Sequence, residues 1–234
     1  LLSEGAASLL PNVDRPAVVF TVRVGVDGIT SLDGAERAIV RNQAKLAYDA
    51  VAPADLPTGF DELNRRIRLA EDARGAPRVE FPEQEIDRLD DGRFVLRFRP
   101  RLESEEQNAA LSLACNLAIG EALYQAGTGL FRVMPDVDER RYRKLRHSAR
   151  AFGLVWPNDV PLATFERSLP RHDPRTSAFL IAVRRAAGGA GYAPFDPEHR
   201  PWHSAVAATY AQATAPLRRL QDRYVIEAAL AVAN

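Results

Sequence analysis

The sequence predicts one domain of the α+β class, built from antiparallel strands and helices. Two segments alternate apolar and polar side chains beside a Gly-containing turn, which is typical of β-hairpins. Longer segments place apolar residues every three or four positions, which is typical of amphipathic helices. The chain shows no internal repeat and no low-complexity linker, and its 234 residues, 46% of them hydrophobic, suffice for one large core.

The first hairpin is expected from the Val-rich segment 17–26, which Asp27-Gly28 turns back into a second strand over 29–41. The next segment, RNQAKLAYDAV at 41–51, predicts a short helix that the following prolines interrupt. The side chains that this helix would turn inward are Leu46, Ala47 and Val51.

Residues 59–73 predict an amphipathic helix, and residues 77–82 predict an extended segment. Asp90-Asp91-Gly92 then supplies the turn of a second hairpin, whose return strand over 93–98 alternates with period two.

Four further segments predict helices from their apolar spacing. These segments are 103–126, 136–151, 174–187 and 215–233. Gly127 is placed to end the first of them. Thr214 is a suitable N-cap for the last, with Pro216 in the first turn, where its missing N–H costs nothing.

Charge and composition limit the class of partner. The 31 basic and 31 acidic residues cancel, so a nucleic acid is expected to bind in a local groove rather than on a basic surface. No run of about 18 apolar residues is present, so we expect no membrane span and a cytoplasmic protein. Cys115 is the only cysteine, which excludes an internal disulfide and a cysteine-rich zinc site. The chain begins with Leu1, so it is expected to be part of a longer protein.

Several patterns have a plain structural explanation. The glycine cluster at 188–191 lacks the Lys-Ser/Thr pair of a phosphate-binding loop, and the four histidines match no metal or hydrolase pattern, so we expect scattered surface or loop histidines. Glu105-Glu106 opens the longest helix, where the helix dipole favours negative charge. The basic side chains of 136–151 form either an RNA-binding stripe or a solvated charged face, and we favour the solvated face.

The strongest constellation is YAQATAPLRRLQDRY at 210–224. If Thr214 caps a helix, the free N–H groups of its first turn and the guanidinium of Arg218 or Arg219 converge, and such an arrangement binds phosphate. The alternative is a capped surface helix in which Arg218 pairs with Asp222 at i,i+4. The residues alone leave both interpretations open.

This constellation resembles a signature of the RNB domain of ribonuclease II-type exoribonucleases, which has a tyrosine, Thr-Ser/Ala-Pro, a hydrophobe, Arg-Arg and an aspartate. Other segments resemble the same family in the same order. They are Ser8–Pro11 with Arg15-Pro16, AKLAYDAV around Tyr48, and RGAPRVEFPEQEID around Phe81. The details of 129–135, 188–195 and 203–211 are most similar to a branch of the family found in high-GC bacteria.

The resemblance implies that residues 1–234 are the C-terminal part of an RNB catalytic domain, with a mixed or antiparallel sheet surrounded by helices. The family binds catalytic Mg²⁺ through aspartates N-terminal to the segments matched here, so no metal ligand is expected in this chain. An N-terminal RNA-binding module and a C-terminal OB-type barrel are also expected outside it. The implied activity is hydrolytic 3′→5′ degradation of single-stranded RNA to nucleoside monophosphates, by a monomer.

The resemblance also assigns roles to individual residues. Arg218, the first arginine of the pair, is implied as the catalytic residue at the scissile phosphate. Asp222 lies one helical turn beyond Arg218, so we expect its carboxylate to orient that guanidinium. The residues implied to bind RNA are Tyr48, Phe81, Glu106, Asn108, Tyr210, Thr214 and Arg219. Tyr48 and Phe81 are the stacking rings, Arg219 binds a neighbouring phosphate or braces the fold, and Asn108 stands where methionine is common.

Two other functions stay open. The absence of the aspartate run is consistent with a catalytically inactive RNB-like domain that binds RNA or assists assembly. The third function is a scaffold whose Arg-rich helices bind another protein.

Overall fold

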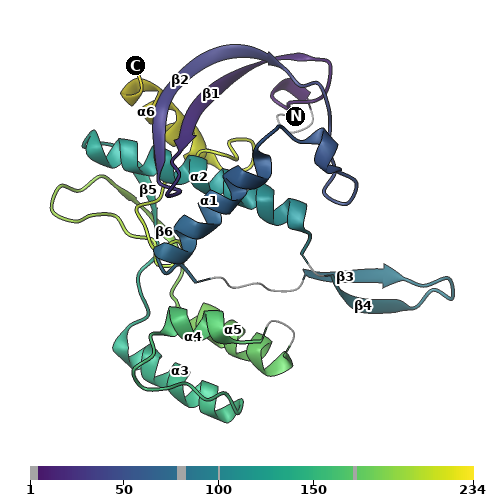
Figure 1. Cartoon of the computed structure of the whole chain (residues 1–234), viewed down its shortest axis with the longest axis vertical. Helices are drawn as coiled ribbons and strands as arrows, with labels where there is room; N and C mark the ends of the chain where they lie inside the picture. Colours follow the sequence, from purple (N-terminus) through teal and green to yellow (C-terminus); the bar gives the residue numbers. More distant parts are fainter. Residues whose placement is uncertain (1–4, 78–82, 100, 171–172) are drawn as a thin grey trace.

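The computed structural model of the chain describes residues 5–77, 83–99, 101–170 and 173–234. Its elements, in chain order, are β1 (Asp14–Val24), β2 (Thr30–Arg41), the short 3-10 helix η2 (Pro53–Asp55), α1 (Phe60–Ala73), β3 (Glu83–Arg88), β4 (Phe94–Arg99), α2 (Glu103–Gln125), β5 (Leu130–Val133), α3 (Glu139–Ala151), α4 (Leu162–Ser168), α5 (Pro174–Ala186), β6 (Gly191–Pro194) and α6 (Leu220–Val232). The expected α+β class is confirmed. Across the described ranges the strands pair as three two-stranded antiparallel sheets, rather than as one larger sheet (Figure 1).

β1 and β2 form a long antiparallel ribbon that arches over α2 and α6 (Figure 1). This is the first predicted hairpin, and its strands pair over their whole length with one irregularity between Thr21 and Val22. At the turn, Gly28 has a φ of 76°, and a Cβ there would lie 2.2 Å from the carbonyl oxygen of Arg66. The turn therefore needs glycine both for its backbone conformation and for the close approach of α1.

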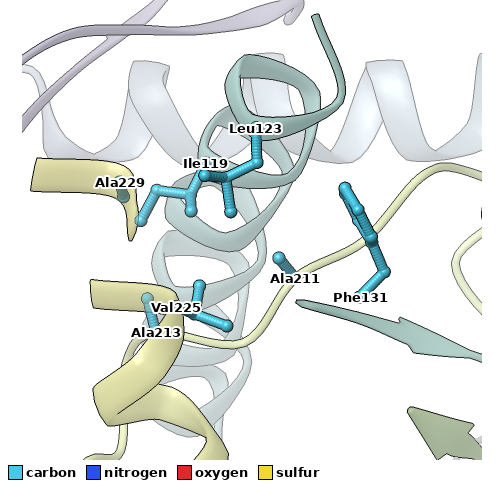
Figure 2. Close-up of a cluster of buried hydrophobic side chains, with 7 residues drawn as sticks. All are labelled: Ile119, Leu123, Phe131, Ala211, Ala213, Val225 and Ala229. Carbon is cyan, nitrogen blue, oxygen red and sulfur yellow. The ribbon is translucent and has the colours of Figure 1, made fainter. Parts of the chain in front are cut away.

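α2 is the central helix, and the main core forms where α6, β5 and the segment 210–214 meet it (Figure 2). The members of this core, each at most 4% exposed, are Ile119, Leu123, Phe131, Ala211, Ala213, Val225 and Ala229. The contact with 210–214 is close, because a Cβ on Gly120 would lie 2.9 Å from the backbone nitrogen of Ala211. The core therefore fixes this segment against the middle of α2.

α1 and the second hairpin also follow the predictions. α1 buries Ile67 against α2, as its apolar spacing requires. The hairpin of β3 and β4 turns at Gly92, which has a φ of 81°, and extends away from the rest of the molecule (Figure 1). The expected extended segment at 77–82 lies, apart from Pro77, outside the described residues.

α3, α4 and α5 form a group with its own apolar core (Figure 1). Trp156 stacks on Phe165 with ring centroids 5.0 Å apart, and the guanidinium of Arg146 lies 3.7 Å from the Trp156 ring centroid. Arg146 also donates hydrogen bonds to the carbonyl oxygens that follow Trp156, so it belongs to this core and not to a basic stripe. The other basic side chains of α3 are exposed, in agreement with a solvated face.

Helix boundaries depart from prediction by a few residues. α2 ends at Gln125, and Gly127 follows in the left-handed region with a φ of 68°. α3 begins at Glu139, later than predicted, because the carboxylate of Asp138 caps it by accepting the N–H of Arg141 at 2.7 Å. α4 and the pair of β5 and β6 were not predicted.

The predicted helix at 41–51 is wrong, because this segment is irregular with a turn at 48–50. Leu46, expected to face inward, is 51% exposed. The Asn42 side chain instead donates to the carbonyl oxygen of Leu9 at 2.8 Å and accepts the N–H of Ala44 at 3.2 Å. A helix this short is unstable without an apolar surface to pack against.

The last helix begins at Leu220 instead of residue 215, and Thr214 is not its N-cap. The carboxylate of Asp222 accepts the N–H of Ala215 at 2.7 Å, and the carbonyl oxygen of Ala215 accepts the N–H of Arg219 at 3.0 Å. These bonds close residues 215–219 into turns, so the helix starts only after them. No helix within the described ranges is both long and apolar enough to span a membrane.

Candidate functional site

The predicted site around 210–214 lies where the chain runs along α2. Burial alternates there, since Ala211 and Ala213 are in the core. The side chains turned away from the core are Tyr210, Gln212 and Thr214. The carbonyl oxygen of Tyr210 accepts the N–H of Arg132 at 2.8 Å, so β5 holds this segment from the other side.

Asn116 joins α2 to this segment, and it was not predicted. The residue is only 2% exposed. Its Nδ2 donates to the hydroxyl oxygens of Tyr210, at 3.1 Å, and Thr214, at 3.3 Å, while its Oδ1 accepts the N–H of Ala213 at 2.9 Å. Asn116 therefore brings the hydroxyls of Tyr210 and Thr214 together, and binding of RNA by these two residues stays a prediction. An asparagine in the apolar stretch of a central helix was the signal for it, because buried amides are nearly always hydrogen-bonded.

His203 packs edge-on against the ring of Tyr210, with ring centroids 5.4 Å apart. It lies in a loop, as expected, but it is buried rather than on the surface, with 8% exposure. Burial and the nearby charge of Arg132 lower the pKa of His203 below its usual value of 6.5. The imidazole is therefore neutral at pH 7, and it packs against the Tyr210 ring without adding charge to the site.

Asp222 is fully buried and binds Arg219 with both oxygens. Its Oδ1 accepts from Nε and its Oδ2 from Nη2, each at 2.8 Å. The prediction that Asp222 orients Arg218 is wrong, because the turn before α6 places Arg219 against the carboxylate instead. The convergence of free N–H groups is also not observed, since the N–H of Ala215 is already bonded to Asp222.

Arg218 has the opposite environment. Its side chain is exposed, and it forms no ion pair or side-chain hydrogen bond with any residue in the described ranges. A guanidinium without a carboxylate partner is available to bind phosphate oxygens at two points. The bonds between Arg219 and Asp222 agree with the alternative in which Arg219 braces the fold. Binding of a phosphate of RNA by Arg219 stays a prediction.

A second group of predicted residues meets at the start of α2. Asn108 donates from Nδ2 to the hydroxyl oxygen of Tyr48 at 2.9 Å, and Ser104 donates to the carbonyl oxygen of Tyr48 at 2.6 Å. Tyr48 is 50% exposed and, with Ser104, lines a cleft of about 940 Å³ between the loop 48–59 and the first turns of α1 and α2. Asn108 and Asn116 are separated by about 12 Å along the axis of α2.

The two glutamates at this end of α2 have different environments. Glu105 accepts hydrogen bonds from Arg99 and from the N–H of Leu102, each at 2.8 Å, and the guanidinium lowers the pKa of the carboxyl below its usual value. It therefore stabilises the helix start, as proposed for one member of the pair. Glu106 forms an ion pair with Arg68 at 3.3 Å, and its contact with RNA stays a prediction. Phe81 lies outside the described residues.

A Mg²⁺ site would need several carboxylates close together. Within the described ranges, no three His, Cys, Asp or Glu side chains form a group that could hold a metal ion. The donor set present here does not fit the metal, so no step is assigned to Mg²⁺ on this chain.

Comparison with protein families decides the family. The model of the RNB domain matches residues 1–232, which is nearly the entire chain. The chain belongs to the RNB domain family. A comparison with curated proteins gives no match.

Solved structures share the fold of this RNB domain. The apo form of Mycoplasma genitalium RNase R matches with a TM-score of 0.80 and 18% identity, covering 97% of this chain and 38% of that one. RNase R in complex with double-stranded RNA matches with a TM-score of 0.77 and 17% identity, covering 97% and 44%. Yeast Ssd1, described as a pseudonuclease, matches with a TM-score of 0.65 and 17% identity, covering 97% and 30%. The RNB domain described here thus spans less than half the length of each of these proteins.

Proposed function

We propose that this RNB domain is the C-terminal part of the catalytic domain of a Mg²⁺-dependent exoribonuclease, which degrades single-stranded RNA from its 3′ end to nucleoside 5′-monophosphates. The observation that carries the proposal is the environment of the two adjacent arginines in the family signature. Asp222 holds Arg219 in the fold, which leaves Arg218 exposed and without an acidic partner among the residues that the structure describes. Such an arginine is suited to stabilise charge that develops on a phosphate in the transition state.

The other predicted residues are proposed to hold the RNA. Tyr210 and Thr214 would contact the substrate near Arg218, and Tyr48 would stack on a base without sequence preference. Glu106 and Asn108, at the start of α2, would bind the same strand. The ligands of Mg²⁺ are proposed to lie N-terminal to this chain, where the metal would activate water and neutralise the scissile phosphate.

The proposal also covers the branch of the family, the cellular location and the oligomeric state of the protein. We assign the chain to the branch of the family found in high-GC bacteria, on the basis of 129–135, 188–195 and 203–211. The enzyme would act in the cytoplasm as a monomer. The neutral net charge is compatible with this, because a channel needs only local positive potential.

The second candidate function is a catalytically inactive RNB domain that binds RNA. The structural similarity to yeast Ssd1, a pseudonuclease, favours this alternative. One assay distinguishes the two functions. It uses a longer protein that includes the N-terminal aspartates, with oligo(A) and Mg²⁺. An exoribonuclease releases mononucleotides from oligo(A), whereas an inactive RNA-binding domain does not.

The decisive variant in that longer protein is Arg218→Ala. We expect turnover to fall by about 100-fold or more while the Kd for oligo(A) changes much less, because the guanidinium acts on the developing charge. Arg218→Lys should restore little, since an ammonium lacks the two-point geometry. Equal losses of binding and turnover would reassign Arg218 to substrate docking. Residues 1–234 alone should leave oligo(A) intact, and EDTA-sensitive release of mononucleotides by them would refute the proposed location of the metal ligands.

A further inference from the structure

Asn116 has a defined orientation, which hydrogen bonding decides. The backbone N–H of Ala213 is only a donor, so the amide atom that faces it at 2.9 Å must be the carbonyl oxygen, Oδ1. Nδ2 must then face the hydroxyls of Tyr210 and Thr214. Because Nδ2 carries two protons and no available lone pair, it donates one hydrogen bond to each hydroxyl.

The hydroxyls of Tyr210 and Thr214 therefore each accept a hydrogen bond from Asn116. A hydroxyl oxygen that accepts one hydrogen bond still has its own proton to donate. Neither Tyr210 nor Thr214 donates a side-chain hydrogen bond to any residue in the described ranges, and no bond joins the two hydroxyls to each other. Thr214 is exposed and Tyr210 is half-buried, so neither side chain is sealed in the core.

We propose that Asn116 is a positioning residue that makes the hydroxyls of Tyr210 and Thr214 a pair of hydrogen-bond donors for one phosphate group of the bound RNA. A phosphate suits this pair because its oxygens only accept hydrogen bonds, and a charged acceptor gives stronger bonds than a neutral one. This inference rests on the proposed function, in that it requires the chain to bind RNA at this site.

The pair is held rigidly. His203 packs against the Tyr210 ring, while the close approach of Ala211 to Gly120 fixes the backbone between the two hydroxyls. The nearest acidic side chain along the chain, Asp222, is buried and faces Ala215 and Arg219. The donors are therefore oriented before RNA arrives, and no carboxylate on this turn competes for them.

The test is Asn116→Asp in residues 1–234, with the Kd for a fluorescent oligo(A) measured by anisotropy at low salt. Aspartate has the same shape as asparagine, but a carboxylate oxygen, which accepts hydrogen bonds, replaces the donor Nδ2. The hydroxyls of Tyr210 and Thr214 then donate their protons to this oxygen and can no longer donate them to RNA. We expect the Kd to rise about tenfold or more, since two bonds to a charged group are removed. The Tm, recorded alongside, shows whether the variant is folded.

A double-mutant cycle separates this effect from the added negative charge. In a chain carrying Tyr210→Phe and Thr214→Val, both donors are absent, so Asn116→Asp should weaken RNA binding by clearly less than it does in the wild type. Asn158→Asp, on an exposed loop of the group formed by α3, α4 and α5, adds the same charge elsewhere and should leave the Kd unchanged.

An unchanged Kd for Asn116→Asp, or an equal rise in the chain without the hydroxyls, would overturn the inference. If Asn116→Asp does not fold, the variant with Tyr210→Phe and Thr214→Val decides, because it too should raise the Kd about tenfold. Wild-type affinity in that variant would overturn the inference as well. Failure of the wild-type chain to bind oligo(A) would instead refute RNA binding by this chain, on which the inference depends.

Discussion

The pair formed by Arg219 and Asp222 should dominate the stability of the signature segment. Asp222 is fully buried, whereas the Arg219 side chain is 25% exposed. Breaking a buried pair by removing one partner costs about 3–5 kcal/mol, and the partial exposure of Arg219 places this pair near 3 kcal/mol. In Asp222→Asn, the amide nitrogen would face a guanidinium donor. The free energy of unfolding should therefore fall by about 3 kcal/mol, with a decrease in Tm of roughly 6–12 °C for a chain of this size.

Urea denaturation followed by circular dichroism measures this change, with Arg219→Ala as the reciprocal variant. Arg218→Ala is the matched control, because it removes the same side chain one position earlier and should change the free energy of unfolding by no more than about 0.5 kcal/mol. The reasoning is refuted if Arg218→Ala and Arg219→Ala destabilise the chain equally. It is also refuted if Asp222→Asn unfolds at the urea concentration of the wild type.

Three further perturbations test other parts of the structure. Gly120→Ala should lower the free energy of unfolding, measured in urea, by about 1–2 kcal/mol, because the new Cβ would lie 2.9 Å from the backbone nitrogen of Ala211. Alanine has the better helix propensity, so a variant more stable than the wild type would contradict the close approach of the two segments. Burial raises the pKa of Glu166 from 4.5 to about 7, so its stabilising contribution is complete below pH 4.5 and is lost as the pH rises through 7. Thermal unfolding of Glu166→Gln should therefore show about 2–3 kcal/mol more stability than the wild type at pH 8 and no difference at pH 4, whereas a constant difference would contradict the raised pKa. If the proposed function is right, Phe81→Ala in a longer protein that includes the N-terminal aspartates should shift the length of the final oligonucleotide on a gel with little change in Tm. A large loss of Tm would indicate that Phe81 is a core residue.

Local patterns were sufficient for the elements whose cause is local. The two hairpins follow from period-two alternation and a turn that needs glycine, at Gly28 and Gly92. α1 and α2 follow from apolar spacing, and Gly127 ends α2 because it adopts the left-handed conformation without strain. The residues of the RNB signature were also found from the sequence, because their order and spacing are specific.

The errors occurred where a distant contact competes with a local preference. The segment 41–51 has helical spacing, but Asn42 bonds to the carbonyl oxygen of Leu9 and Leu46 is half exposed instead of packing inward. Thr214 is a good N-cap by type, yet its hydroxyl accepts a hydrogen bond from Asn116, 98 positions earlier in the chain. Cross-chain bonds of this kind have no sequence spacing from which they could be predicted.

The sequence by itself determined the α+β class, the two hairpins, the helices α1, α2 and α5, and the set of residues that make up the family signature. Only the tertiary structure decided what each signature residue does in the fold. Arg218 and Arg219 are adjacent and chemically identical, so no local rule distinguishes them. The distinction arises because the turns before α6 place one guanidinium against the buried Asp222 and leave the other exposed. A buried carboxylate requires a cation, and the backbone path fixes which of the two can reach it.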